Sequence, residues 1–306
     1  MAIVKEEIFG IARKIVANMT YESWRDIPHA GIILDLDATE MLKEVKKLNE
    51  GVTDKSKRIS INTLMLKVIC ESLKVSPKMN AHLEFNKNLV RGKLTTFDHI
   101  NISMPTLLPN GEMMTLNLHN MENKSLCEMT DTISDTIRRA KNTDMNEVMF
   151  EVSMDNTLNG LKKGKVLQAV RRLYGAKMPG KYKVQTLTGK AKKDYYSISE
   201  KDRLTYKDIE QGTITVSNVG SIDREQIYVC PLLEIVPPQT CVIAINPVKE
   251  EPKVIIKENG EKDIDVKKIL PLTIFFDHRA LDLCDIIPFC KKAEEIFKNP
   301  GIIREW

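Results

Sequence analysis

The sequence lacks long apolar runs, and its first residues lack the marks of a secretory signal. No stretch of the 306 residues approaches the roughly 20 consecutive apolar residues that a membrane-spanning helix needs. The N-terminus, MAIVKEEIFG, has neither a cationic start nor a long apolar segment. We therefore expect a cytoplasmic protein. With 42% hydrophobic and 29% charged residues, the chain is long enough to bury a sizeable core.

The six cysteines lack the spacing of a disulfide scaffold or a zinc site. They form no C-x-x-C pair and lie inside apolar segments, which suits reduced and buried thiols. We expect no metal centre. Histidine is scarce as well, with five in the chain. Four of them follow a proline or stand beside turns and polar runs, which favours a structural or solvated role: His29, His82, His99 and His119.

The first half of the chain alternates strand patterns with helical ones. Residues 31–37 form an apolar run typical of a strand. Asn62 is the expected N-cap of a helix that is apolar on nearly every side and therefore buried. Ser125 and Glu128 form an S-x-x-E capping box in front of apolar residues at helical spacing. This alternation predicts helices packed on a sheet.

Four runs in the second half read as strands. They are separated by Pro, Gly and charged turns, and their sequences are TITVSNVG, TCVIAINPV, PKVIIKENG and KILPLTIFF. The last run leads into Asp277 and His278. A final helix is expected from Asp285 and ends before Pro300.

The fifth histidine, His278, lies just after a predicted strand, where a side chain can face a cleft. Asp282 follows four residues later. In an H-x-x-x-D spacing the carboxylate can hold the turn around the imidazole or select its tautomer, as a general base requires. This spacing alone does not establish catalysis, so the surrounding sequence decides.

Several segments resemble one enzyme family. FFDHRALD, which contains His278, resembles the D-H-R-x-x-D-G signature of the dihydrolipoamide acyltransferases of 2-oxo-acid dehydrogenase complexes and of the related chloramphenicol acetyltransferases. TVSNVGSI at 215–222 is similar to the family's T-I-S-N-L-G strand, and VPPQTCVIAI at 236–245 to its P-P-Q strand. Further matches follow in family order: RDIPHAGIILDLDAT at 25–39, PKMNA at 77–81, PNGEMMT at 109–115 and KSLCEM at 124–129.

The resemblance implies a fold and an assembly. It implies an α/β (α+β) fold, a chloramphenicol-acetyltransferase-like mixed β-sheet flanked by helices, as a single catalytic domain over residues 1–306. Residues 143–210 would be a basic insertion within it. The family places its active site between subunits of a homotrimer, and trimers can join into larger assemblies.

The resemblance also implies roles for individual residues. His278 would be the general base, Ser217 would hydrogen-bond the oxyanion of the tetrahedral intermediate, and Asp282 would hold the site. Candidates for substrate or cofactor binding are Arg279, Asn218 and Asn80. The family reaction moves an acyl group between coenzyme A and a thiol, usually of a lipoyl group, in a ternary complex. It needs no metal and no covalent enzyme intermediate.

The resemblance begins near residue 10, which leaves no room for the upstream lipoyl and subunit-binding domains of the family. We therefore expect no lipoyl group on this chain and a separate acyl or lipoyl carrier. Two departures stand beside this expectation. Leu283 replaces the signature's glycine, and NGEMMTLNL replaces a segment with a proline near the family's substrate site. They keep two alternatives open: a non-catalytic trimeric scaffold, and an acyltransferase acting on the amine or hydroxyl of a small molecule.

Acidic residues are missing from one segment within the expected insertion. Residues 161–193 contain eleven Lys or Arg and no Asp or Glu, whereas the whole chain carries a net charge of only +4. A solvated loop around a short amphipathic helix explains such a pattern. The other explanation is an electrostatic site for the phosphates of coenzyme A, an acidic carrier protein or an anionic membrane surface. No nucleic-acid-binding motif accompanies the charge, so we expect no nucleic-acid partner.

Overall fold

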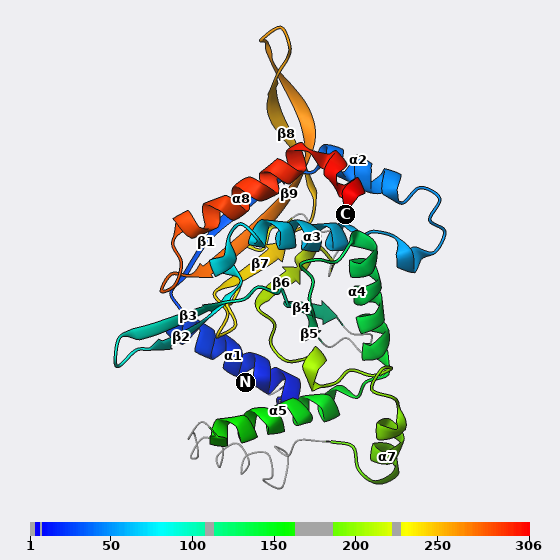
Figure 1. The fold of residues 1–306 in the computed structure, drawn as a ribbon, viewed down its shortest axis with the longest axis vertical. Coiled ribbons are helices and arrows are strands. Elements are labelled where there is room, and N and C mark those ends of the chain that lie inside the picture. The colour runs from blue at the N-terminus through cyan, green and yellow to red at the C-terminus, as the bar shows by residue number, and fades with distance from the viewer. Residues whose placement is uncertain (1–3, 7, 108–112, 163–185, 222–227) are drawn as a thin grey trace.

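A mixed β-sheet forms the centre of the computed structural model, which describes residues 4–6, 8–107, 113–162, 186–221 and 228–306 (Figure 1). The strands lie side by side in the order β1-β9-β7-β6-β4-β5, and β8 pairs with β9. β6 is parallel to both β4 and β7, and the other pairs are antiparallel. The strands are β1 (His29–Asp37), β4 (Ile102–Leu107), β5 (Met113–Leu118), β6 (Ile214–Asn218), β7 (Cys241–Ile245), β8 (Lys249–Ile256) and β9 (Lys262–Asp277).

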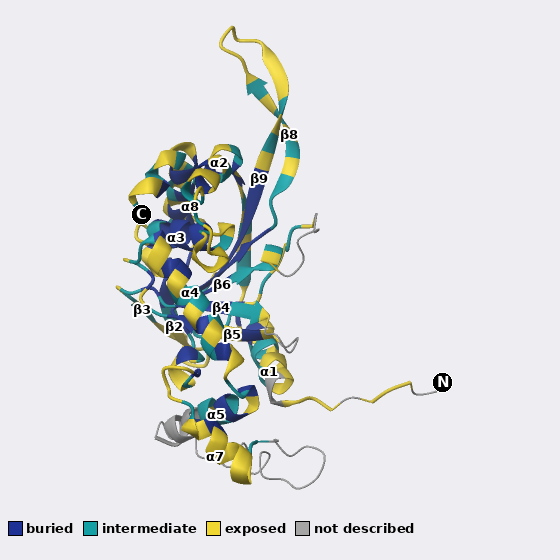
Figure 2. Ribbon diagram, turned by 90° about the vertical axis from the view of Figure 1, so that its right-hand side faces the viewer, coloured by how far each residue is buried: buried dark blue, intermediate teal, exposed yellow. Residues whose placement is uncertain are grey.

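Four helices cover one face of this sheet (Figure 2). They are α2 (Thr39–Leu48), α3 (Ile61–Leu73), α4 (Leu126–Lys141) and α8 (Leu283–Lys298). α3 lies in the main core and is buried over most of its length, as its apolar sequence predicts. Every residue of β7 is buried as well. Cys241, Ile243 and Ile245 belong to the main core, whereas Val242 packs with Ile27 and Ile235 in a smaller cluster.

Helix starts follow the local sequence at some positions and not at others. The capping box of α4 is confirmed, since Ser125 N donates to Glu128 Oε2 at 2.8 Å and Glu128 N donates to Ser125 Oγ at 3.2 Å. The prediction for α3 is wrong. Its N-cap is Ser60, whose Oγ accepts from Thr63 N at 3.0 Å, and Asn62 lies inside the helix. α8 begins at Leu283, two residues earlier than expected.

The β8–β9 hairpin extends beyond the body of the molecule (Figure 1). β9 has 16 residues, and its C-terminal half lies between β1 and β7 while its N-terminal half pairs only with β8 among the described strands. Because side chains alternate along a strand, the hairpin has two distinct faces. One face carries ion pairs, including Lys253–Glu251 and Lys257–Asp263.

A second hairpin and three further helices lie around this core. The hairpin consists of β2 (Ala81–Asn86) and β3 (Arg91–Thr96), and the helices are α1 (Ile11–Asp26), α5 (Met145–Lys162) and α7 (Gly189–Ser197). Most of the basic segment 161–193 and the turn expected at 109–111 lie outside the described residues. Among the helices that the structure describes, none is long and apolar enough to cross a membrane.

The cysteines are free thiols, but not all of them are buried. Cys127 and Cys284 are exposed, so the expectation of burial is wrong for these two. Both lie in the first turn of a helix on its solvent side, because the inward face of that turn is taken by Leu126 in α4 and by Ile286 in α8. Cys70 is buried, and this burial raises the pKa of its thiol to about 12. Cys70 therefore stays a neutral core thiol at ordinary pH.

Candidate active site

His278 lies directly after the end of β9, in a turn held at both ends by backbone hydrogen bonds. Its N–H donates to the carbonyl oxygen of Pro28 at 3.0 Å, which joins the end of β9 to the start of β1. The N–H groups of Ala280 and Leu281 both donate to the carbonyl oxygen of Asp277, at 2.9 and 3.0 Å. The turn therefore fixes the backbone on both sides of the histidine.

The hydrogen bonding of the His278 ring indicates which nitrogen carries the proton. Nδ1 lies 3.1 Å from the carbonyl oxygen of Leu281 and 3.4 Å from Asp282 Oδ1. Both oxygens accept hydrogen bonds, so Nδ1 is the donor and carries the hydrogen. In the neutral ring this leaves the lone pair on Nε2. The side chain is 53% exposed, so Nε2 can reach a substrate.

Asp282 and Leu283 form the start of α8 rather than a special loop. The backbone N–H of Asp282 donates to Asp285 Oδ2 at 3.0 Å, and the Asp282 side chain is 77% exposed. Leu283 is the first residue of the helix and is exposed. The non-glycine residues with positive φ in the described chain are Val90 and Asn120, so the backbone at Leu283 does not require a glycine.

Ser217 does not meet His278 within one chain. In the strand register, Ser217 of β6 lies opposite Ala244 of β7, and Ala244 lies opposite Thr273 of β9. Thr273 precedes His278 by five residues. With a rise of about 3.3 Å per residue and about 4.8 Å between strands, the two Cα atoms lie roughly 19 Å apart. That distance is too large for one acyl group to touch both side chains.

The three predicted binding residues all make contacts inside the protein. The Asn218 amide donates to Asn62 Oδ1 at 2.9 Å. Asn80 is buried, and its Nδ2 donates to the carbonyl oxygens of Phe97 and His99 at 3.1 and 2.9 Å. These bonds give both asparagines a role in joining elements of the fold. Ligand binding by them stays a prediction.

Arg279 is directed at its neighbour Asp277. Arg279 Nη2 lies 2.6 Å from Asp277 Oδ2, and Nε lies 2.9 Å from Oδ1. The sequence does give a signal for this pair, because Asp277 is an acidic residue at the end of a buried apolar strand and such a carboxylate needs a partner. From the sequence, Asp277 was expected only as the residue that precedes His278, with no role of its own.

His29 lies beside the site but has both ring nitrogens occupied. Its Nε2 accepts from the N–H of Ile235 at 3.1 Å, and Nδ1 lies 2.9 Å from the carbonyl oxygen of Ile27. Trp24 stacks on the ring at 4.6 Å between centroids. These contacts confirm the structural role expected for His29.

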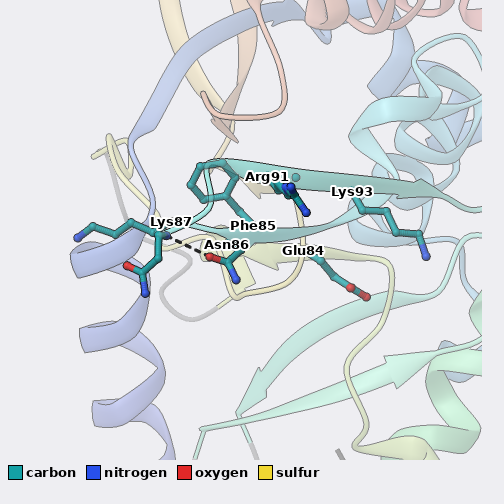
Figure 3. Close-up of a pocket in the computed structure, with 8 residues that line it drawn as sticks. Glu84, Phe85, Asn86, Lys87, Arg91 and Lys93 are labelled. Carbon is teal, nitrogen blue, oxygen red and sulfur yellow. Dashed lines mark hydrogen bonds between the residues drawn. The ribbon is translucent and has the colours of Figure 1, made fainter.

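The described residues contain no group of three or more His, Cys, Asp or Glu side chains that could hold a metal ion. A shallow pocket lies along the β2–β3 hairpin, and none of the predicted site residues lines it (Figure 3). Its lining residues are Glu84, Phe85, Asn86, Lys87, Asn88, Arg91, Gly92 and Lys93.

A histidine whose Nδ1 donates to a carbonyl oxygen presents a lone pair on Nε2, which is what a general base needs. Residues 2–153 and 185–303 match the model of one protein family, described as 2-oxoacid dehydrogenases acyltransferase (catalytic domain). The chain therefore belongs to this family.

Two relatives illustrate the similarity in sequence. The dihydrolipoyllysine-residue acetyltransferase component of the Zymomonas mobilis pyruvate dehydrogenase complex is 21% identical over 294 residues, which are 96% of this chain and 50% of that protein. The mitochondrial dihydrolipoyllysine-residue acetyltransferase component of the Saccharomyces cerevisiae pyruvate dehydrogenase complex is 22% identical. The match covers 94% of this chain and 45% of that protein. The chain thus spans about half the length of the curated relatives it matches.

Solved structures confirm the predicted fold. A probable dihydrolipoamide acetyltransferase from Listeria monocytogenes has a TM-score of 0.64 and 18% identity, covering 97% of this chain and 95% of its own. The Azotobacter vinelandii dihydrolipoamide acetyltransferase has a TM-score of 0.65 and 15% identity, covering 99% and 94%. At these identities the likeness shows the mixed sheet flanked by helices.

Proposed function

We propose that this chain is a coenzyme-A-dependent acyltransferase that moves an acyl group between coenzyme A and a thiol, with His278 as the general base. The contact of Nδ1 with the Leu281 carbonyl oxygen carries the proposal, because it leaves the lone pair on Nε2. Nε2 takes the proton of the acceptor thiol as its sulfur attacks the thioester carbonyl. His278 then returns this proton to the departing thiolate, so the enzyme ends the cycle unchanged.

The Azotobacter relative supports this assignment. Its catalytic mechanism was investigated at a serine, a histidine and an asparagine that lies four residues after the histidine. Asp282 has the same spacing from His278 in this chain. Ser217, at the end of β6, is the proposed donor to the oxyanion that forms when the thiol attacks.

The separation of Ser217 and His278 supports an active site shared between subunits. At roughly 19 Å the two side chains can act on one substrate only if each site combines residues of two copies. We propose a homotrimer in which His278 of one copy faces Ser217 of its neighbour. Another solved relative is the cubic core of the pyruvate dehydrogenase multienzyme complex, which shows that this fold supports assembly in that protein.

An exposed apolar surface on the β8–β9 hairpin also suits a homotrimer. Val254 lies opposite Ile264 in the strand register, and Ile256 and Val266 extend the same face. These four side chains are 59–73% exposed. Contiguous exposed aliphatic side chains mark interaction surfaces, because their burial removes apolar area from water. A second copy would cover this face.

The acyl group is proposed to be exchanged with a lipoyl carrier or with coenzyme A, as the resemblance implies. Residues 161–193, with their eleven cations, are the proposed contact for an acidic carrier or for the phosphates of coenzyme A. Binding of a lipoyl carrier measured at increasing salt tests this part. Affinity that does not change with salt would contradict an electrostatic contact.

Turnover of acyl-coenzyme A tests the proposed function. The protein is incubated with a panel of acyl-coenzyme A donors and dihydrolipoamide, and mass spectrometry follows free coenzyme A and the S-acyl product. We expect His278→Ala to lower the rate about 10²- to 10⁴-fold, whereas His99→Ala, at an exposed histidine, keeps it. Equal rates for wild type and His278→Ala would reject the base. Amine and hydroxyl acceptors in parallel reactions test the other acyl transfers.

A further inference from the structure

The two residues on either side of His278 form a closed ion pair. The Asp277 side chain is 0% exposed and that of Arg279 is 22% exposed. Asp277 accepts from Arg279 Nε and Nη2 and also from the Arg279 backbone N–H, at 3.0 Å. A buried carboxylate without such partners would be costly, so these bonds hold the arginine in one orientation.

This ion pair fixes the same backbone that orients the histidine ring. The bond from Arg279 N to Asp277 Oδ1 links the peptide N–H that follows His278 to the side chain of the residue before it. The carbonyl oxygen that accepts the hydrogen bond from Nδ1 belongs to Leu281, and the N–H of Leu281 donates to the Asp277 carbonyl oxygen. Asp277 therefore holds both partners of this contact: His278 is the next residue in the chain, and Leu281 is hydrogen-bonded to the Asp277 carbonyl oxygen.

The outer side of the arginine is held by another element. The Arg279 guanidinium lies 5.3 Å from the centre of the Phe85 ring, on the β2–β3 hairpin seen in Figure 3. The guanidinium thus joins the turn to this hairpin while it neutralises Asp277. A lysine supplies the charge but neither the two-pronged hydrogen bonding nor the flat face.

We infer that Asp277 and Arg279 are positioning residues that keep His278 in its catalytic orientation and tautomer. They act through the histidine and do not touch the substrate. The inference rests on the proposed function insofar as His278 is the base. Loosening the turn lets the ring lose the Leu281 contact, and even a displacement of about 1 Å can cost roughly 100-fold in rate.

Kinetics of Arg279→Lys and Asp277→Asn test the inference, with Arg139→Lys as a matched control. Arg139 makes a similar bidentate pair with Asp208, at 2.8 and 2.7 Å, far along the chain from His278. We expect both site variants to lower kcat about 10- to 100-fold while KM stays within about 2-fold. The control should lose stability only. An unchanged kcat, or a rise in KM alone, would overturn the inference.

The state of the ring is measured separately from activity. The chain has five histidines, so ¹⁵N-histidine labelling gives a spectrum in which His278 is assigned by comparison with His278→Ala. We expect the Nδ1–H form in the wild type and a mixture of tautomers in Arg279→Lys, which retains the positive charge. If the wild type turns over no donor, the proposed function fails and these spectra still decide the inference. A retained Nδ1–H form in both site variants would refute it.

Discussion

The Nδ1 atom of His278 lies 3.1 Å from the carbonyl oxygen of Leu281, three residues further along the same turn. The Asp282 carboxylate is more distant from Nδ1, at 3.4 Å, and is mostly exposed to solvent. A backbone carbonyl cannot be titrated or replaced by substitution, so it favours the Nδ1–H tautomer of the neutral ring as long as the turn is folded. The carboxylate is a secondary contact in this arrangement.

Asp282→Asn should therefore retain most of the activity. The asparagine oxygen can still accept from Nδ1, and an exposed charge contributes little. We expect kcat to fall by less than about 5-fold, which corresponds to about 1 kcal/mol in the barrier. Steady-state rates with the best acyl donor measure this. A loss above about 100-fold would show that the negative charge itself is required.

Ser217→Ala should lower kcat about 10²- to 10³-fold, because an oxyanion donor is lost. Mixed assemblies then test whether sites are shared. When Ser217→Ala and His278→Ala chains are assembled together at equal amounts, about a quarter of the sites combine an intact serine with an intact histidine. We expect up to that fraction of the wild-type activity to return. If activity does not return in assemblies that are shown to contain both chains, Ser217 and His278 do not share an active site across subunits.

The apolar face of the β8–β9 hairpin should be required for assembly. In the double variant Val254→Lys with Ile264→Glu, opposite charges face each other across the two strands and preserve the hairpin. Burying them against another copy would be unfavourable. We expect monomers in sedimentation experiments and a loss of activity.

The ion-paired face of the same hairpin gives the matched control. Lys253→Thr with Asp263→Thr removes partners of two exposed ion pairs, which contribute little to stability. This variant should stay assembled and active. The apolar face would not be the contact between copies if the Lys253→Thr, Asp263→Thr control dissociates. The same follows if the Val254→Lys, Ile264→Glu variant stays assembled.

Asp208 should contribute acid-sensitive stability. Burial raises its pKa, but hydrogen bonds from Arg139 and Thr205 outweigh this and hold the pKa below the ordinary 3.8. Because the folded pKa is lowered, the contribution is complete above about pH 4 to 5 and is lost as the pH falls through the folded value. Asp208→Asn should lower the free energy of unfolding by about 3 kcal/mol at pH 7.

Urea unfolding at several pH values measures this contribution. The difference between wild type and Asp208→Asn should shrink as the pH falls below about 4. Asp202→Asn is the control, because its ion pair with Arg138 is exposed. A difference that stays constant down to pH 2 would show that the charge of Asp208 is not the cause.

Leu283→Gly should not improve the enzyme. Leu283 is the exposed first residue of α8 and has no positive φ. A glycine there adds conformational freedom to the unfolded chain, so we expect a loss of about 0.5 to 1 kcal/mol in stability and unchanged kcat. Thermal unfolding and the acyl-transfer rate measure the two effects. A large gain in activity would indicate that Leu283 impairs the site.

Features that depend on neighbouring residues followed from the sequence. The Ser125–Glu128 capping box forms as predicted because both partners lie within one helical turn. The second-half strands follow from their apolar runs, and the D-H-R motif together with the other matching segments indicated the family to which the chain belongs. Ser60 and Asn62 can both cap a helix, however, and local chemistry does not separate them. The choice is associated with a contact between Asn62 and Asn218, 156 residues away.

The sequence by itself determined the order of the strands along the chain, the strand-end position of His278 and the family. Only the tertiary structure decided that Ser217 and His278 lie far apart, that Asp277 and Arg279 close on each other beside the ring, and that Leu281 receives Nδ1. The reason is physical. Local patterns fix which face of an element is apolar, whereas strand register and the path of a turn depend on contacts between segments distant in the sequence.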